Sequence, residues 1–105
     1  MVSAKPSRDD VVVRFVKKAL DLGATEIEVE YESGWEHIFA VGGYSGVEIG
    51  SLKSSGKEAR ALREALCDIR EQPRKLMVGG SQYALTVRIH QSFGEDVYRI
   101  TIKKA

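Results

Sequence analysis

The stretch "TEIEVEYESGWEHIFAV", residues 25–41, decides the fold class of this chain. Its first half alternates strictly, with Ile27, Val29 and Tyr31 on one side and glutamates on the other, which is typical of a half-buried strand. Ser33-Gly34 has the residue types of a two-residue hairpin turn. The segment "WEHIFAV" therefore predicts a second strand, antiparallel to the first.

A helix is expected before this hairpin and a third strand after it. Hydrophobic residues recur at helical spacing from Val12 to Leu20, after a start near Ser7, and Gly23 is suited to end the helix in a left-handed conformation. On the other side, Gly42-Gly43 predicts another two-residue turn, and "YSGVEI" predicts a third strand.

The remaining chain predicts a helix and a hairpin. Ser55 and Glu58 form an S-x-x-E capping box, and Pro73 ends the helix. Apolar residues alternate over 83–89 and 98–102, and "SFGED" between them is a turn. The stretch "VEIGSLKSSGKEAR" lacks both the spacing and the hydroxyl of a phosphate-binding Walker loop, because Glu58 follows Lys57.

The 105 residues are expected to form one α+β domain, 1–105, with residues 1–6 flexible. The predicted architecture is a two-layer sandwich of order α-β-β-β-α-β-β, in which both helices cover one face of an antiparallel sheet. The C-terminal hairpin either extends this sheet or covers its outer face. A single cysteine, Cys67, excludes an internal disulfide, and no long apolar segment is present, so a cytoplasmic location without membrane contact is expected.

The charges are distributed unevenly despite a net charge of +1. Residues 24–52 contain six glutamates and neither lysine nor arginine, whereas the other regions are mildly basic. Binding to a polyanion must therefore come from a local patch rather than from the whole protein.

The two predicted turns place one histidine between carboxylates. With Ser33-Gly34 and Gly42-Gly43 as two-residue turns, His37 opposes Glu30 on one neighbouring strand and Glu48 on the other. This group either orients a catalytic acid–base histidine, offers mixed ligands to a metal, or is a charge cluster on a solvated sheet face. We expect neither a metal nor a cofactor.

Two aromatic residues, Trp35 and Phe39, flank His37 on the same predicted face. They are expected to be covered by the C-terminal hairpin, to contact a second copy in a homodimer, or to stack on bases. The adjacent glutamates would repel a phosphate backbone and favour the first two. The hairpin itself carries a basic strip, with Arg88 alongside and His90 roughly opposite Arg99, which could pair with the glutamates within one chain or between two.

The segments "LDLGA", "SGWEHIFAV" and "SSGKEARALREAL" together resemble the HicA-type mRNA interferases. These toxins have a double-stranded-RNA-binding-like fold and a Gly-Ser-His-His-aliphatic-aromatic stretch whose first histidine is catalytic. Gly34, His37, Ile38 and Phe39 match that stretch, whereas Trp35 replaces the serine and Glu36 stands at the position of the catalytic histidine. The resemblance covers residues 7–70, supports the fold and does not supply an intact catalytic site.

Two function hypotheses follow. The first is an RNA-contacting domain of HicA-like ancestry, related to toxin–antitoxin systems, in which His37 is the candidate for proton transfer. Its phosphate contacts would come from the cations of the two helices, Arg14, Lys17, Lys18, Lys57, Arg60 and Arg63. The second is a non-enzymatic protein-interaction or homodimerisation module that uses Trp35, Phe39, Arg88 and Arg99.

Overall fold

The computed structural model describes residues 8–42 and 45–105. It contains two helices and six strands in the order α1 (Arg8–Asp21), β1 (Glu26–Glu32), β2 (Trp35–Gly42), β3 (Ser45–Lys53), α2 (Lys57–Glu71), β4 (Arg74–Val78), β5 (Ser81–Ser92) and β6 (Glu95–Lys104). The strands form one antiparallel sheet with the order β3-β2-β1-β6-β5-β4. The α+β class with an antiparallel sheet is confirmed. The predicted element order is wrong at one place, because it lacks β4.

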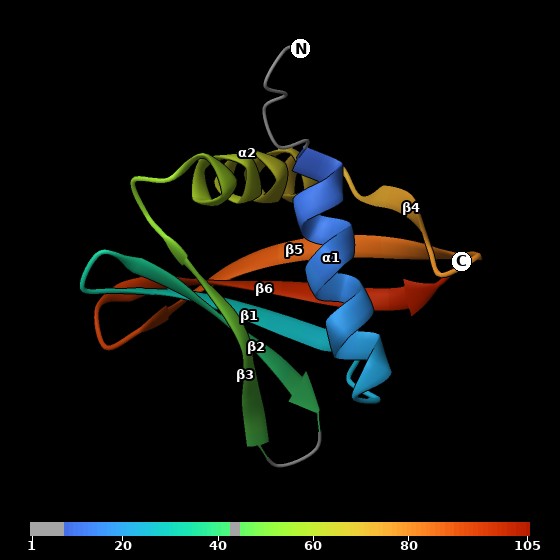
Figure 1. Cartoon of the computed structure of the whole chain (residues 1–105), viewed down its shortest axis with the longest axis horizontal. Coiled ribbons are helices and arrows are strands. Elements are labelled where there is room, and N and C mark those ends of the chain that lie inside the picture. Colours follow the sequence, from blue (N-terminus) through green and yellow to red (C-terminus); the bar gives the residue numbers. More distant parts are fainter. Residues whose placement is uncertain (1–7, 43–44) are drawn as a thin grey trace, which may run out of the picture.

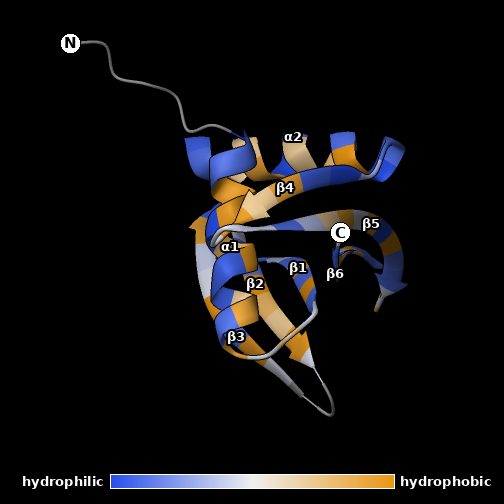
Figure 2. Ribbon diagram, turned by 90° about the vertical axis from the view of Figure 1, so that its right-hand side faces the viewer, coloured by the Kyte–Doolittle hydropathy of each residue, from blue (hydrophilic) through white to orange (hydrophobic). Residues whose placement is uncertain are grey.

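The sheet is strongly curled, and α1 and α2 lie on its inner side (Figure 1). Hydrophobic residues recur along both helices and along the strands (Figure 2), and the buried ones pack into a single cluster. One continuous core joins Phe15 of α1, Ile27 of β1, Leu66 of α2 and Leu85 of β5, all of them buried. Within the described part of the chain, neither helix has the length and hydrophobicity needed to cross a membrane.

Three hairpins close with pairs of residues in the left-handed conformation. Ser33 and Gly34 have φ values of 52° and 87°, which confirms the predicted turn between β1 and β2. The pairs Gly79–Gly80 and Phe93–Gly94 close the β4–β5 and β5–β6 hairpins in the same way. Positive φ at both central residues is the property of a type I′ turn, whose twist matches that of the adjoining strands.

The predicted pairing of β2 with β3 is wrong. Gly42 still belongs to β2 and pairs with Ser45, so the chain does not turn at Gly42, and Gly43 lies outside the described residues. A β-bulge between Ile38 and Phe39 shifts the register further along. His37 therefore opposes Ser51 rather than Glu48.

The helix ends agree with the sequence at one site and differ at another. Gly23 ends α1 with a φ of 76°, as expected. At α2, however, the N-cap is Gly56 and no side chain caps the helix, so the predicted Ser55–Glu58 capping box is wrong. The Glu58 carboxylate instead lies 2.6 Å from Nη1 of Arg14 on α1. The expectations for Ser7 and for residues 1–6 lie outside the described residues.

The C-terminal hairpin extends the sheet rather than covering its outer face. Strand β6 pairs with β1, with Ile100 opposite Ile27 and Arg99 opposite Glu28. The first strand of the chain thus lies beside the last one. This pairing joins the acidic strands β1–β3 to the basic strands β4–β6.

We predict that Gly50→Ala destabilises the protein by about 1–3 kcal/mol, the usual effect of overpacking a core. A Cβ atom at Gly50 would lie 2.7 Å from Cε1 of the buried Phe15 ring. Gly46→Ala in the same strand is the matched control, because its Cβ would meet nothing closer than 3.7 Å. Urea unfolding of both variants measures the difference, and equal stabilities would contradict the close packing of Phe15 on β3.

Candidate nucleic-acid interface

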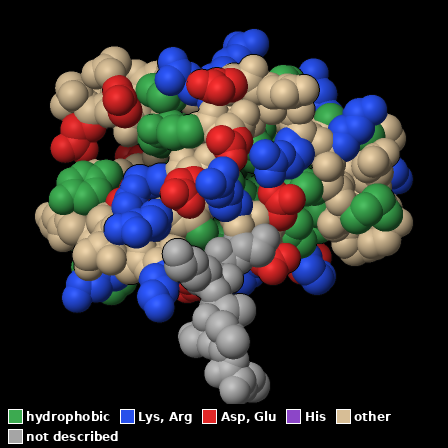
Figure 3. Space-filling view, turned by 90° about the horizontal axis from the view of Figure 1, so that it is seen from above, with side chains coloured by type: hydrophobic (Ala, Val, Ile, Leu, Met, Phe, Trp, Pro, Cys, Tyr) green, Lys and Arg blue, Asp and Glu red, His purple; other side chains and the backbone are tan. Residues whose placement is uncertain are grey.

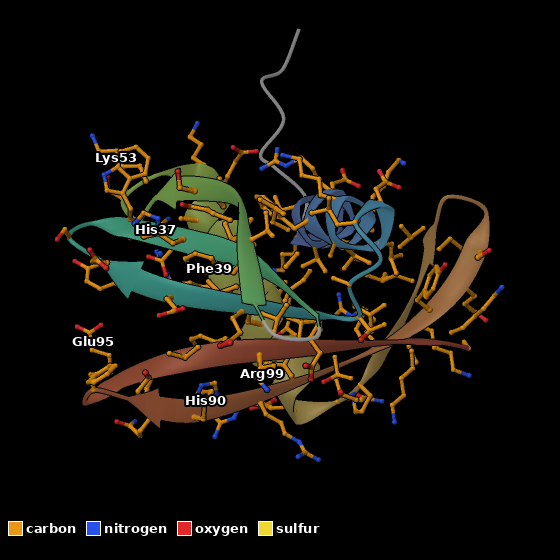
Figure 4. The ribbon with its side chains drawn as sticks, turned by 90° about the horizontal axis from the view of Figure 1, so that it is seen from below. His37, Phe39, Lys53, His90, Glu95 and Arg99 are labelled. Atoms are coloured by element: carbon orange, nitrogen blue, oxygen red, sulfur yellow. The ribbon has the colours of Figure 1, made fainter. Side chains whose placement is uncertain are left out.

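The outer face of the sheet, turned away from the helices, carries most of the residues that the sequence singles out. Figure 4 labels His37, Phe39, His90 and Arg99 among them. Its side chains form rows across the strands. One row runs from β3 to β5 through Glu48, Phe39, Glu28, Arg99 and Arg88. The next row runs through Ser51, His37, Glu30, Val97 and His90.

His37 lies among carboxylates, although one predicted pairing is wrong. Glu30 is directly opposite on β1, as expected from the Ser33–Gly34 turn. Glu48 is displaced along β3 by the bulge, and its Oε2 nevertheless lies 2.7 Å from Nδ1 of His37. This contact orients the imidazole. Within residues 8–42 and 45–105, no three His, Cys, Asp or Glu side chains are grouped as metal ligands.

The helix cations do not form a basic surface. Lysine and arginine alternate with acidic side chains on the side seen from α2 (Figure 3), and α1 and α2 together carry eight Lys and Arg against seven Asp and Glu. Four of the six predicted RNA-contacting side chains also have partners within the chain. Arg14 pairs with Glu58, Lys17 with Asp21, Lys18 with the carbonyl of Ile49, and Arg63 with Glu36.

A basic groove lies instead on the outer face of β5 and β6. It is a hollow of about 580 Å³ lined by Glu26, Ala84, Thr86, Arg88, Ile89, His90, Arg99, Thr101 and Lys103. Residues 74–105 contain six Lys and Arg against two Asp and Glu, so this groove lies in the most basic part of the chain. We call this surface the basic groove.

Two arginines of the basic groove face each other directly across the strands. Arg88 pairs with Arg99, which corrects the expectation that His90 would do so; His90 pairs with Val97. Like charges in this position destabilise a sheet. Glu28 offsets part of this repulsion, since its Oε1 lies 3.0 Å from Nη2 of Arg99. Arg88 and Lys103 have no ion-pair partner among the described residues.

The two predicted interface aromatics lie at separate places on the outer face. Trp35 begins β2 and is 43 % exposed, whereas Phe39 is partly buried between Glu48 and Glu28. The C-terminal hairpin covers neither of them. They do not form one continuous apolar surface, because His37 stands between them along β2.

Glu36, which the resemblance to HicA-type toxins places at the position of their catalytic histidine, lies on the opposite face of the sheet from His37. Glu36 is buried on the inner side, where the Ser54 hydroxyl donates a hydrogen bond to its Oε2. The alternation of β2 indicates this position from the sequence, because side chains two residues apart lie on the same face of a strand. Ile38 and Ala40 face the core, and Glu36 lies on the same side. The sequence interpretation places Glu36 in the acidic region and at the position of the catalytic histidine, and does not predict its burial.

Tyr98 is also on the inner side, at the start of β6. Burial raises the pKa of its phenol, and Cys67, Asp96 and Glu36 nearby raise it further, whereas Arg70 opposes the change. The phenol is therefore neutral at physiological pH. It can donate and accept hydrogen bonds there and presents an uncharged ring.

Comparison with known proteins gives no family for this chain: no protein-family model matches it, and neither does any curated protein. The functional assignment therefore depends on the residues described above.

Glu28→Gln and Arg88→Gln are expected to change the stability in opposite directions. Removing the Glu28 carboxylate leaves only Glu26, whose Oε1 lies 3.9 Å from Nη1 of Arg99, to compensate the two arginines, and this lowers the free energy of unfolding. Removing Arg88 relieves the repulsion and raises it. Each effect should be about 0.2–1 kcal/mol. Urea unfolding at low salt measures both, and changes of the same sign would refute this electrostatic account of the row.

The folded protein should lose stability above pH 10 through Tyr98. Its pKa in the folded state lies above the ordinary value of 10.0, so the stabilisation is complete below that pH and decreases as the pH rises toward the folded pKa. Tyr98→Phe removes this dependence. Urea unfolding between pH 8 and 11 compares the two proteins, and identical pH profiles would show that Tyr98 titrates normally.

Proposed function

We propose that this protein is a non-catalytic RNA-contacting domain that binds single-stranded phosphate backbone through the basic groove. The observation that carries the proposal is the direct pairing of Arg88 with Arg99, next to Lys103, in a concave surface. An anion held between the two guanidinium groups would relieve their repulsion.

The chemistry of the basic groove suits a phosphodiester. Guanidinium groups bind phosphate oxygens with charge-assisted and often bidentate hydrogen bonds. Thr86 and Thr101 lie opposite each other on β5 and β6, in the row next to Arg88 and Arg99. Their two hydroxyls can donate to the same oxygens. Nε of Arg99 is buried and has no hydrogen-bond partner among the described residues, so the hydrogen-bonding capacity of this side chain is incompletely used.

The acidic strands argue against cleavage. His37 is the candidate for proton transfer, but Glu30 and Glu48 adjoin it, and Glu28 lies directly opposite Arg99 on the side of the groove nearer to His37. A phosphate that approaches His37 from the basic groove meets these carboxylates and is repelled. The HicA-like ancestry is thus proposed for the fold and for RNA contact, and not for the enzymatic activity.

Binding of a fluorescein-labelled uridine 12-mer, followed by anisotropy from 20 to 200 mM KCl, tests this function. Two to three neutralised phosphates predict a slope of log affinity against log salt of about −1.4 to −2. Arg88→Gln should weaken binding and make this slope about 0.7 less steep, because one phosphate contact is lost.

Lys57→Gln is the matched control, since Lys57 is an exposed cation of α2 without an ion-pair partner in the described part of the chain. It removes the same charge at a site outside the groove and should leave the affinity unchanged. Equal losses in both variants would show binding by overall charge. Either that result or the absence of binding at 20 mM KCl contradicts the proposal.

A further inference from the structure

A second hollow, of about 500 Å³, lies on the inner side of the sheet. It is bounded by α2 and by the β1–β2 and β5–β6 hairpins, whose ends lie side by side (Figure 1). Its volume is within the range of 300–1,000 Å³ that is usual for ligand sites. We call it the inner cleft, and it shares no lining residue with the basic groove.

The inner cleft contains a buried carboxylate that its neighbours satisfy only in part. The Glu36 side chain is 9 % exposed, and burying a charge in this way is costly unless it is paired. Both of its contacts fall on Oε2, namely the Ser54 hydroxyl and Nη1 of Arg63 at 3.6 Å. Oε1 has no hydrogen-bond partner among the described residues.

The other lining side chains favour a positively charged ligand. Glu95 and Asp96 are exposed at the start of β6, so the cleft carries three carboxylates against the single cation of Arg63. Tyr31 and Tyr98 add two aromatic rings. A guanidinium or ammonium group gains from both features, through charge-assisted hydrogen bonds to carboxylates and through contact with aromatic faces.

We infer that the inner cleft binds an arginine side chain presented by a partner protein. The guanidinium would donate to Oε1 of Glu36 and lie against the tyrosine rings, while its aliphatic stem contacts the apolar lining. Arginine suits the site better than lysine, because its planar group can both stack on a ring and make two parallel hydrogen bonds. This binding is independent of the proposed RNA contact, since the two sites are on opposite faces of the sheet.

A fluorescein-labelled peptide, Gly-Ala-Leu-Arg-Leu-Ala-Gly, provides the test, with a citrulline version as the uncharged isostere. The arginine peptide should bind at least tenfold more tightly than the citrulline peptide, which corresponds to about 1.4 kcal/mol. Glu36→Gln should reduce the affinity for the arginine peptide by a similar factor and leave binding of the uridine 12-mer unchanged.

Glu32→Gln is the matched control, because Glu32 is exposed and lies on the outer face. If Glu36→Gln fails to fold, Glu95→Gln replaces it, since Glu95 is an exposed lining residue with no ion pair among the described residues. A loss confined to the cleft variants supports the inference. Equal binding of the citrulline peptide, equal loss in Glu32→Gln, or equal affinity for free arginine amide would overturn it.

Discussion

The pairing of β1 with β6 is the constraint on which the rest of this structure depends. Strand β1 has isoleucine and valine on the inner side and glutamates on the outer side, so its position fixes both the core and the outer charge pattern. Ile100 completes the core opposite Ile27, and Arg99 meets Glu28 on the other face. A one-residue slip would place glutamate in the core and isoleucine in water.

The pairing of β1 with β6 also places the two proposed binding surfaces on opposite faces of the sheet, and their charges have opposite signs. The outer face of β5 and β6 carries Arg88 and Lys103 without ion-pair partners among the described residues, whereas the inner cleft gathers carboxylates around a single arginine. The curled sheet keeps these opposite charges apart. The proposed anionic polymer and the proposed cationic protein segment would therefore not compete for one surface.

The sequence predicts local features of this protein well and long-range features poorly. Ser33–Gly34 and the alternation of residues 26–32 determine the β1–β2 register, because a two-residue turn and a half-buried strand leave one pairing. The predicted partner of His37 is wrong for two reasons: the chain does not turn at Gly42, and the bulge at Ile38/Phe39 has no sequence signal. Strand β4 is a short edge strand directly after Pro73. Because its residues 74 and 75 are polar, the sequence pattern does not predict a strand there.

For the candidate sites, too, the sequence predicts local features better than long-range ones. The prediction of RNA contacts on α1 and α2 depends on charge alone, and charge does not reveal that Arg14 and Arg63 have carboxylate partners. The basic groove needs β5 and β6 in register, which the hairpin predicts only approximately. The inner cleft combines residues from five separate elements or loops between positions 31 and 98, and no local pattern brings them together.

The strand order has a consequence for synthesis on the ribosome. Because β6 lies between β1 and β5, the sheet has a gap at its middle until residues 95–104 have left the exit tunnel. The edge of β1 that pairs with β6 lacks its hydrogen-bonding partner during that interval. At roughly 5–20 residues per second, the seventy or so residues after β1 take several seconds to translate, and during this time β1 lacks one of its two neighbours.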